Sequence, residues 1–104
     1  MTQIDQVQVG TYLRLAAPVT TFTPGSVAAN TMTPITQTGC DIHVGETGVI
    51  FVGTPATNAI KWGHVTCTTD GSAIISLLNP TVGALTPTAA SASAPYIMLL
   101  WGSK

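Results

Sequence analysis

The placement of proline constrains the fold of this chain more than any other feature. A proline inside a helix removes a backbone hydrogen bond and clashes with the preceding turn, so it ends or kinks the helix. The 104 residues contain seven prolines, and ten glycines interrupt the chain further. No apolar pattern of helical period persists for three turns between these breakers. The sequence therefore predicts an all-β chain. The prolines stand at Pro18, Pro24, Pro34, Pro55, Pro80, Pro87 and Pro95.

Short runs of β-branched and apolar residues lie between the breakers. Strands are predicted near residues 6–15, 18–23, 30–38, 47–53, 60–69, 72–78 and 95–101. Short strands at this spacing, separated by turn residues, are typical of a sandwich or a barrel. We expect one domain over residues 1–104, an antiparallel β-sandwich of jelly-roll-like or immunoglobulin-like type. Residues 1–15 are expected to form an extended N-terminal arm.

The Asp-Gly pair at 70–71 gives the clearest local prediction. Asp-Gly between two strand-like runs favours a two-residue type I′ turn, because glycine adopts positive φ without a Cβ clash. This turn places Thr69 opposite Ser72 and, two residues further, Cys67 opposite Ile74. Both faces of the resulting hairpin carry apolar groups. The hairpin is therefore expected to be covered on one face by the core and on the other by a neighbour.

Charge is scarce, at 7% of residues with a formal net charge of −1. A free soluble domain usually has a surface that is about 25–35% charged. Threonine, at eighteen positions, takes over part of the polar role, and such a surface suits packing against copies or partners. Three Lys or Arg residues are too few to bind the phosphate backbone of a nucleic acid, so we expect no nucleic-acid partner. We also expect no membrane span and no signal peptide.

One turn-rich stretch holds three candidate metal ligands. Asp41, His43 and Glu46 lie close together in sequence, and His64 offers a fourth ligand. Carboxylates and imidazoles suit zinc or manganese, but this spacing matches no zinc signature. We therefore interpret the stretch as a polar turn and expect no bound metal.

Nucleophilic catalysis is the next possibility that the sequence raises. Cys40 with His43 or His64 has suitable chemistry, but there is no nucleophile elbow and no phosphate-binding glycine loop. Cys40 and Cys67 allow one disulfide at most, and without secretion signals both are expected to be free, buried thiols. The sequence thus indicates a non-enzymatic protein without cofactor or small-molecule substrate.

Aromatic and apolar residues on predicted strands are the candidate interface residues. The run over residues 96–101 is the most apolar in the chain, and tryptophan often anchors interfaces. An alternative is that Trp62 or Trp101 stacks on a sugar. The interface candidates are Tyr12, Leu13, Trp62, His64, Tyr96, Met98 and Trp101.

A pattern of turn residues extends over residues 25–101. It comprises Gly-Ser-Val-Ala-Ala-Asn-Thr at 25–31, Val-Gly-Glu at 44–46, Asn-Pro-Thr at 79–81, Thr-Pro-Thr at 86–88 and a final apolar strand with Tyr96. This pattern resembles small β-rich virion proteins of tailed bacteriophages, among them head decoration (cement) proteins, although Glu46 stands where those proteins have Asp. The resemblance implies a homotrimer on the outer capsid surface that binds the major capsid protein and stabilises contacts between capsomers. A tail or fibre module and a carbohydrate-binding surface module are the alternatives.

Overall fold

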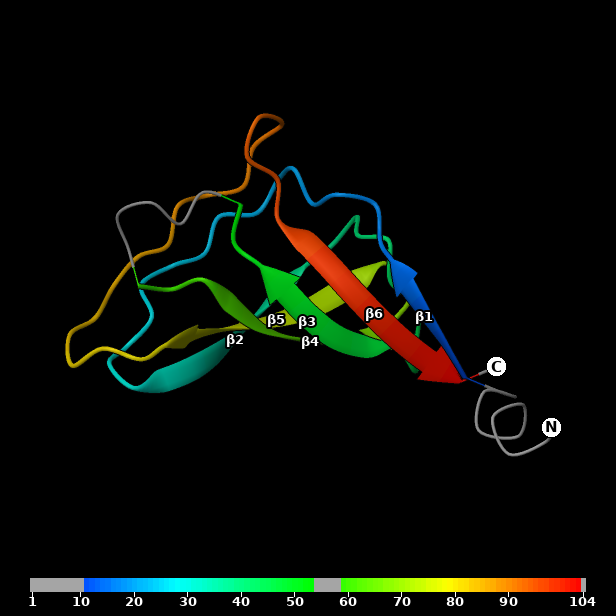
Figure 1. Ribbon diagram of the computed structural model, residues 1–104, viewed down its shortest axis with the longest axis horizontal. Helices are drawn as coiled ribbons and strands as arrows, with labels where there is room; N and C mark the ends of the chain where they lie inside the picture. Colours follow the sequence, from blue (N-terminus) through cyan, green and yellow to red (C-terminus); the bar gives the residue numbers. More distant parts are fainter. Residues whose placement is uncertain (1–10, 54–58, 104) are drawn as a thin grey trace, which may run out of the picture.

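Six antiparallel strands form a single sheet in the part of this protein that the structure describes. The structure is a computed structural model that describes residues 11–53 and 59–103. The sheet has the order β1-β6-β3-β4-β5-β2 (Figure 1). Its strands are β1 (Thr11–Leu15), β2 (Thr31–Gln37), β3 (Thr47–Phe51), β4 (Trp62–Thr69), β5 (Ser72–Asn79) and β6 (Ile97–Ser103). The described residues contain no helix, so the predicted all-β class is confirmed.

Two long connections cover one face of the sheet. Residues 16–30 join β1 to β2, residues 80–96 join β5 to β6, and Figure 1 shows both running along the same side of the molecule. They meet at three isolated bridges, such as that between Val19 and Tyr96, rather than in a second sheet. The expected sandwich is therefore not confirmed. The predicted strand over residues 18–23 was wrong: Val19 pairs with Tyr96 and Phe22 with Ala90, and the partner segment turns at residues 91–94 between these two bridges, which interrupts the pairing.

The core lies between this covered face, here called the inner face, and the two connections. Alternate residues of the strands point into it, such as Ile75 of β5 and Leu100 of β6, both at 0% exposure. From the connections, the rings of Phe22 and Tyr96 meet edge to face with centroids 5.6 Å apart. Each fully buried large side chain stabilises the fold by about 1.5–3 kcal/mol. This alternation leaves the opposite face of the sheet, the outer face, without a covering layer.

Asn79 joins the two connections to the sheet. Its side chain is fully buried at the end of β5, and its Nδ2 donates to the carbonyls of Val27 and Gly83, each at 2.9 Å. Its Oδ1 accepts hydrogen bonds from the backbone N–H and the hydroxyl of Thr81. A buried amide with all of these partners fixes the path of both connections over the inner face.

The turn between β4 and β5 confirms part of the hairpin prediction. Thr69 lies opposite Ser72, as expected from a two-residue loop. Of the two loop residues, Gly71 has positive φ, at 82°, whereas Asp70 does not. The predicted type I′ turn was wrong, because that turn needs positive φ at both positions.

The rest of the hairpin register differs from the prediction by one residue. A β-bulge between Cys67 and Thr69 shifts the pairing, so that Cys67 lies opposite Ala73 and Val65 opposite Ile75. The extra residue in a bulge changes which side chains face each other across the pair. Here it lets all four of these apolar side chains point to the inner face, where they are buried. Burial of the apolar set therefore accounts for the bulge.

The expected N-terminal arm over residues 1–15 is not confirmed. Residues 11–15 form β1, an edge strand that pairs with β6 from Thr11 opposite Ser103 to Leu15 opposite Leu99. The remainder of the predicted arm, residues 1–10, lies outside the described residues.

Candidate functional site

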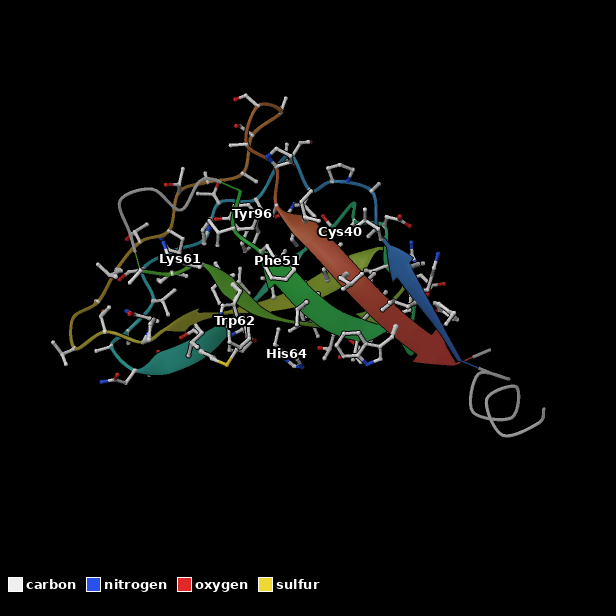
Figure 2. The ribbon with its side chains drawn as sticks, in the orientation of Figure 1. Cys40, Phe51, Lys61, Trp62, His64 and Tyr96 are labelled. Carbon is white, nitrogen blue, oxygen red and sulfur yellow. The ribbon has the colours of Figure 1, made fainter. Side chains whose placement is uncertain are left out.

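The outer face of the sheet carries residue types that are unusual for the surface of a monomer. On β6, β3 and β4 the cross-strand register aligns Ile97 with Phe51 and Phe51 with Trp62. Figure 2 shows Phe51 and Trp62 near each other at the ends of their strands. Further along the same two strands, Val49 lies opposite His64. These side chains form two neighbouring rows that cross the outer face from strand to strand.

Large apolar side chains remain exposed across this face. Phe51 is 47% exposed, Trp62 44% and Trp101 43%, and at the β1 edge Leu13 and Leu15 are 66% and 67% exposed. Met32 of β2 extends the face at the opposite edge. Exposed apolar groups this large, gathered on one face, mark an interaction surface more often than single exposed residues do.

Charge is missing from the outer face. Its positions on the six strands, as far as the structure describes them, include threonine, serine and His64 as polar residues but no Asp, Glu, Lys or Arg. With strands about 4.8 Å apart and a rise of about 3.4 Å per residue, such a face covers about 600 Å². Apolar side chains make up part of this area, and threonine, serine and His64 make up the rest. A partner can cover the outer face without removing the hydration water of a charged side chain.

Four of the seven predicted interface residues lie on this face. They are Leu13, Trp62, His64 and Trp101. Tyr96 and Met98 instead point into the core, both at 0% exposure, so they do not contribute to a surface of this chain. Sequence reasoning missed Phe51 and Met32, although the alternation of residues 47–51 would have placed Phe51 on the same face as Val49.

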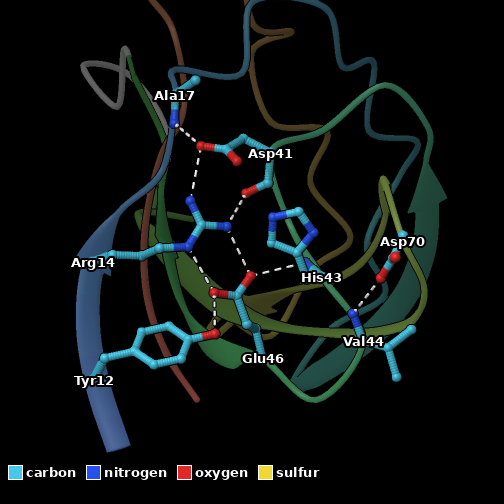
Figure 3. A network of polar contacts seen from close by, with 8 residues as sticks. All are labelled: Tyr12, Arg14, Ala17, Asp41, His43, Val44, Glu46 and Asp70. Carbon is cyan, nitrogen blue, oxygen red and sulfur yellow. Dashed lines mark hydrogen bonds and ion pairs between the residues drawn. The ribbon is translucent and has the colours of Figure 1, made fainter. Parts of the chain in front are cut away.

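Tyr12, the seventh candidate, belongs to a polar network on the inner side of the β1 edge strand (Figure 3). Arg14 of β1 donates through Nε to Glu46 Oε2 at 2.6 Å and through Nη2 to Glu46 Oε1 at 2.7 Å. The Tyr12 hydroxyl donates to Glu46 Oε2 at 2.7 Å, and the backbone N–H of His43 donates to Oε1 at 2.8 Å. Glu46 is only 2% exposed, and this set of donors satisfies its carboxylate.

Asp41 extends the same network toward solvent. Arg14 Nη1 donates to Asp41 Oδ2 at 2.9 Å, and the backbone N–H of Ala17 donates to the same oxygen at 2.8 Å. The network thus joins β1 and the residues after it to the loop that precedes β3. Its arrangement is that of a structural clamp, because each carboxylate already has a guanidinium partner.

The pKa values in the network follow from these contacts. Hydrogen bonds from Arg14 lower the pKa of Glu46 to about 2, although burial opposes the shift. The Ala17 N–H and Arg14 lower the pKa of Asp41. The hydrogen bond to Glu46 raises the pKa of Tyr12. The lowered carboxyl pKa values favour charged Glu46 and Asp41, and the raised pKa of Tyr12 favours its neutral phenol, which are the forms that these hydrogen bonds require.

The metal-ligand candidates of the sequence do not gather into one site. His64 points to the outer face from β4, whereas Asp41 and Glu46 are engaged by Arg14. Within residues 11–53 and 59–103, no three His, Cys, Asp or Glu side chains are grouped to hold an ion.

The two cysteines are free thiols in the structure. Cys67 is buried, as predicted, whereas Cys40 is half-buried and lines a hollow of about 310 Å³ between residues 17–21 and 38–41. Burial raises the pKa of the Cys40 thiol, which disfavours the reactive thiolate. The position and state of this thiol fit packing better than catalysis.

Comparison with known proteins finds no matching family model, no similar curated protein and no similar solved structure. The part of the chain that the structure describes also has no helix long and apolar enough to cross a membrane.

Proposed function

We propose that this protein is a non-enzymatic structural protein of a virion, a decoration protein that binds the outer surface of a phage head. The observation that carries the proposal is the uncharged, uncovered outer face of the sheet. The turn-residue pattern that resembles decoration proteins supports the choice of a capsid as the setting. On this proposal the major capsid protein is the partner, and the homotrimer expected from the sequence remains a prediction.

The physical role of such a protein follows from the size of its contact. Covering a face of about 600 Å² buries about 1,200 Å² in total, the lower limit of a standard specific interface. At about 25 cal/mol per Å² of apolar area the burial is favourable, but the loss of translational and rotational freedom offsets much of it. Single contacts are then weak, and many copies on one shell act together in opposing its expansion.

The test uses virions of the phage that encodes the chain and particles from which its gene is deleted. We expect the deleted particles to release DNA at a lower temperature, measured by dye access during heating. Added wild-type protein should restore the release temperature. Phe51→Lys should not restore it, because it places a charge between Ile97 and Trp62 on the outer face.

Val82→Lys is the matched control for this experiment. Val82 is 92% exposed but lies in the connection after β5, so the substitution adds the same charge outside the outer face. It should restore the release temperature as wild type does. The proposal fails if the deleted particles release DNA at the wild-type temperature, or if Phe51→Lys restores them equally.

The alternatives make different predictions in the same system. A tail or fibre module would be located by gold-labelled antibody on the tail of the virion and not on the head. A carbohydrate-binding module would bind glycans immobilised on a surface, and Trp62→Ala would remove that binding. Trp62 and Trp101 lie on the outer face, but the charged side chains that often bind sugar hydroxyls are missing from the described positions around them.

A further inference from the structure

The two edges of the sheet differ in how they are protected against pairing with another strand. An exposed edge strand presents unpaired N–H and C=O groups, and natural sheets block such edges with proline, lysine or a bulge. The β2 edge carries Pro34 at its centre. Proline in an edge strand keeps its nitrogen, which has no hydrogen, on the solvent side. The β1 edge, with the sequence Thr-Tyr-Leu-Arg-Leu, has neither proline nor lysine.

The hydrogen bonding of β1 defines which of its groups face the free edge. Just after β1, the N–H of Ala16 donates to the carbonyl of Met98, so the backbone of Ala16 points toward β6. In an antiparallel pair the direction alternates along the strand, and Arg14 and Tyr12 therefore also bond to β6. The N–H and C=O groups of Thr11, Leu13 and Leu15 point the other way. No strand among the described residues pairs with them on that side.

The one charged side chain of β1 is kept away from this edge contact. Arg14 points to the inner side, where its guanidinium bonds Glu46 and Asp41. Leu13 and Leu15 point to the outer face and are two-thirds exposed. A second strand placed beside β1 would bury these leucines without desolvating a charge.

We propose that β1 pairs with β1 of a second copy of this chain, antiparallel about a two-fold axis at Leu13. A two-fold contact requires a surface that is complementary to itself, and an antiparallel pair of identical strands meets this condition. With the axis at Leu13, Leu13 lies opposite its own copy and Leu15 opposite Thr11. The outward N–H and C=O groups of all three residues then find partners across the contact.

This pairing would join the two sheets and make their outer faces continuous. It deepens the proposed function, because a joined pair presents two docking faces side by side to a shell and each strengthens the other's binding. The contact gives pairs of chains, whereas the homotrimer expected from the sequence would need a different surface. Head-to-tail pairing of β1 with β2, which makes rings, is hindered by Pro34.

The register at the axis supplies the test. In a hydrogen-bonded antiparallel pair, opposite Cα atoms are about 5.5 Å apart, within the range that a disulfide spans. The Cα atoms of the two Leu15 residues would lie about 14 Å apart, too far for a disulfide. In a Cys40→Ser background, which leaves only the buried Cys67, Leu13→Cys should form a disulfide-linked dimer under mild oxidation. Leu15→Cys, with matched exposure, should stay monomeric in non-reducing electrophoresis.

Solution mass provides the second measurement. By light scattering, the full chain, with a monomer mass of 10.7 kDa, should double in mass as its concentration rises. Leu13→Lys should remain at the monomer mass, and Val82→Lys should dimerise as wild type does. Equal cross-linking of the Leu13 and Leu15 cysteines, or a monomer at all concentrations, would overturn the proposal. So would a dimer that Phe51→Lys dissociates and Leu13→Lys does not.

The two proposals fail separately in these experiments. Loss of the β1 contact would leave a monomer that still binds heads through the outer face and still loses binding on Phe51→Lys. A chain that cross-links through Leu13 but changes no head stability would retain the pairing and refute the decoration role.

Discussion

Replacing Arg14 with methionine tests whether the polar network holds β1 to the sheet. Methionine keeps much of the apolar stem but removes the guanidinium, and with it four hydrogen bonds to Glu46 and Asp41. Glu46, at 2% exposure, would then keep only the donors from Tyr12 and His43. A buried carboxylate without a cationic partner is the main consequence of this change.

Glu46 and Asp41 differ in burial, so changes at their two ion pairs should alter the free energy of unfolding by very different amounts. Breaking a buried ion pair by removing one partner reduces the free energy of unfolding by about 3–5 kcal/mol. The side chain of Asp41 is 37% exposed, and removing the charge of such a group changes stability by about 0–1 kcal/mol. We therefore expect a loss of about 3–5 kcal/mol for Arg14→Met and below about 1 kcal/mol for Asp41→Asn. In Arg14→Met/Glu46→Gln the loss should be smaller than the sum of the single losses, because no unpaired charge remains.

Urea unfolding followed by far-UV circular dichroism measures these free energies in all four variants. An Arg14→Met loss as small as that of Asp41→Asn would mean that water solvates Glu46, and the burial argument would be refuted. Strict additivity in the double variant would refute the ion pair as the origin of the loss.

Three further predictions follow from the inner face and the network. The folded pKa of Glu46, about 2, lies below its ordinary value of 4.5, so its stabilisation should be complete above pH 4.5 and disappear as pH falls toward 2; urea unfolding across this range should show the decline in wild type and a flatter profile in Glu46→Gln. Gly63→Ala should lower the free energy of unfolding by about 1–3 kcal/mol, because its Cβ would lie 2.3 Å from the carbonyl oxygen of Ser76, whereas Gly25→Ala, with open space around it, should change it by less than about 0.5 kcal/mol; equal losses in urea would contradict the packing argument. Asn79→Ala should cost about 2–3 kcal/mol, because it removes the hydrogen bonds of a fully buried amide to both connections and takes away the acceptor of the Thr81 N–H, and calorimetry showing an unchanged melting temperature would contradict this.

Local sequence patterns were enough to predict the six strands of the sheet, although they also predicted a strand over residues 18–23 that does not form. Residues 72–79 form β5, close to the strand that the apolar and β-branched run over residues 72–78 predicts, although its alternating burial is not visible in a run with apolar residues on both faces. The Asp-Gly turn and the proline spacing likewise defined where strands end and excluded helices. These features depend on backbone conformations that neighbouring residues favour, so they can be read without knowledge of the fold.

Candidate interface residues were predicted less well, because the sequence does not say which face of a strand is covered. Trp101 and Met98 both lie in the apolar C-terminal run, yet Trp101 is exposed and Met98 is buried. An apolar run looks the same whether both of its faces are covered or one remains open. Only the position of the two connections over the inner face distinguishes the two residues.

The sequence alone determined the all-β class, the strand positions and the scarcity of charge, since each follows from residue types and short-range spacing. The tertiary structure decided the features that depend on contacts distant in sequence. The bulge at Cys67 depends on which residues the core accepts, and the pairing of Arg14 with Glu46 joins residues 32 positions apart. The uncovered outer face likewise exists because both connections pair with each other and bond to Asn79 over the other face, an arrangement that no local pattern encodes.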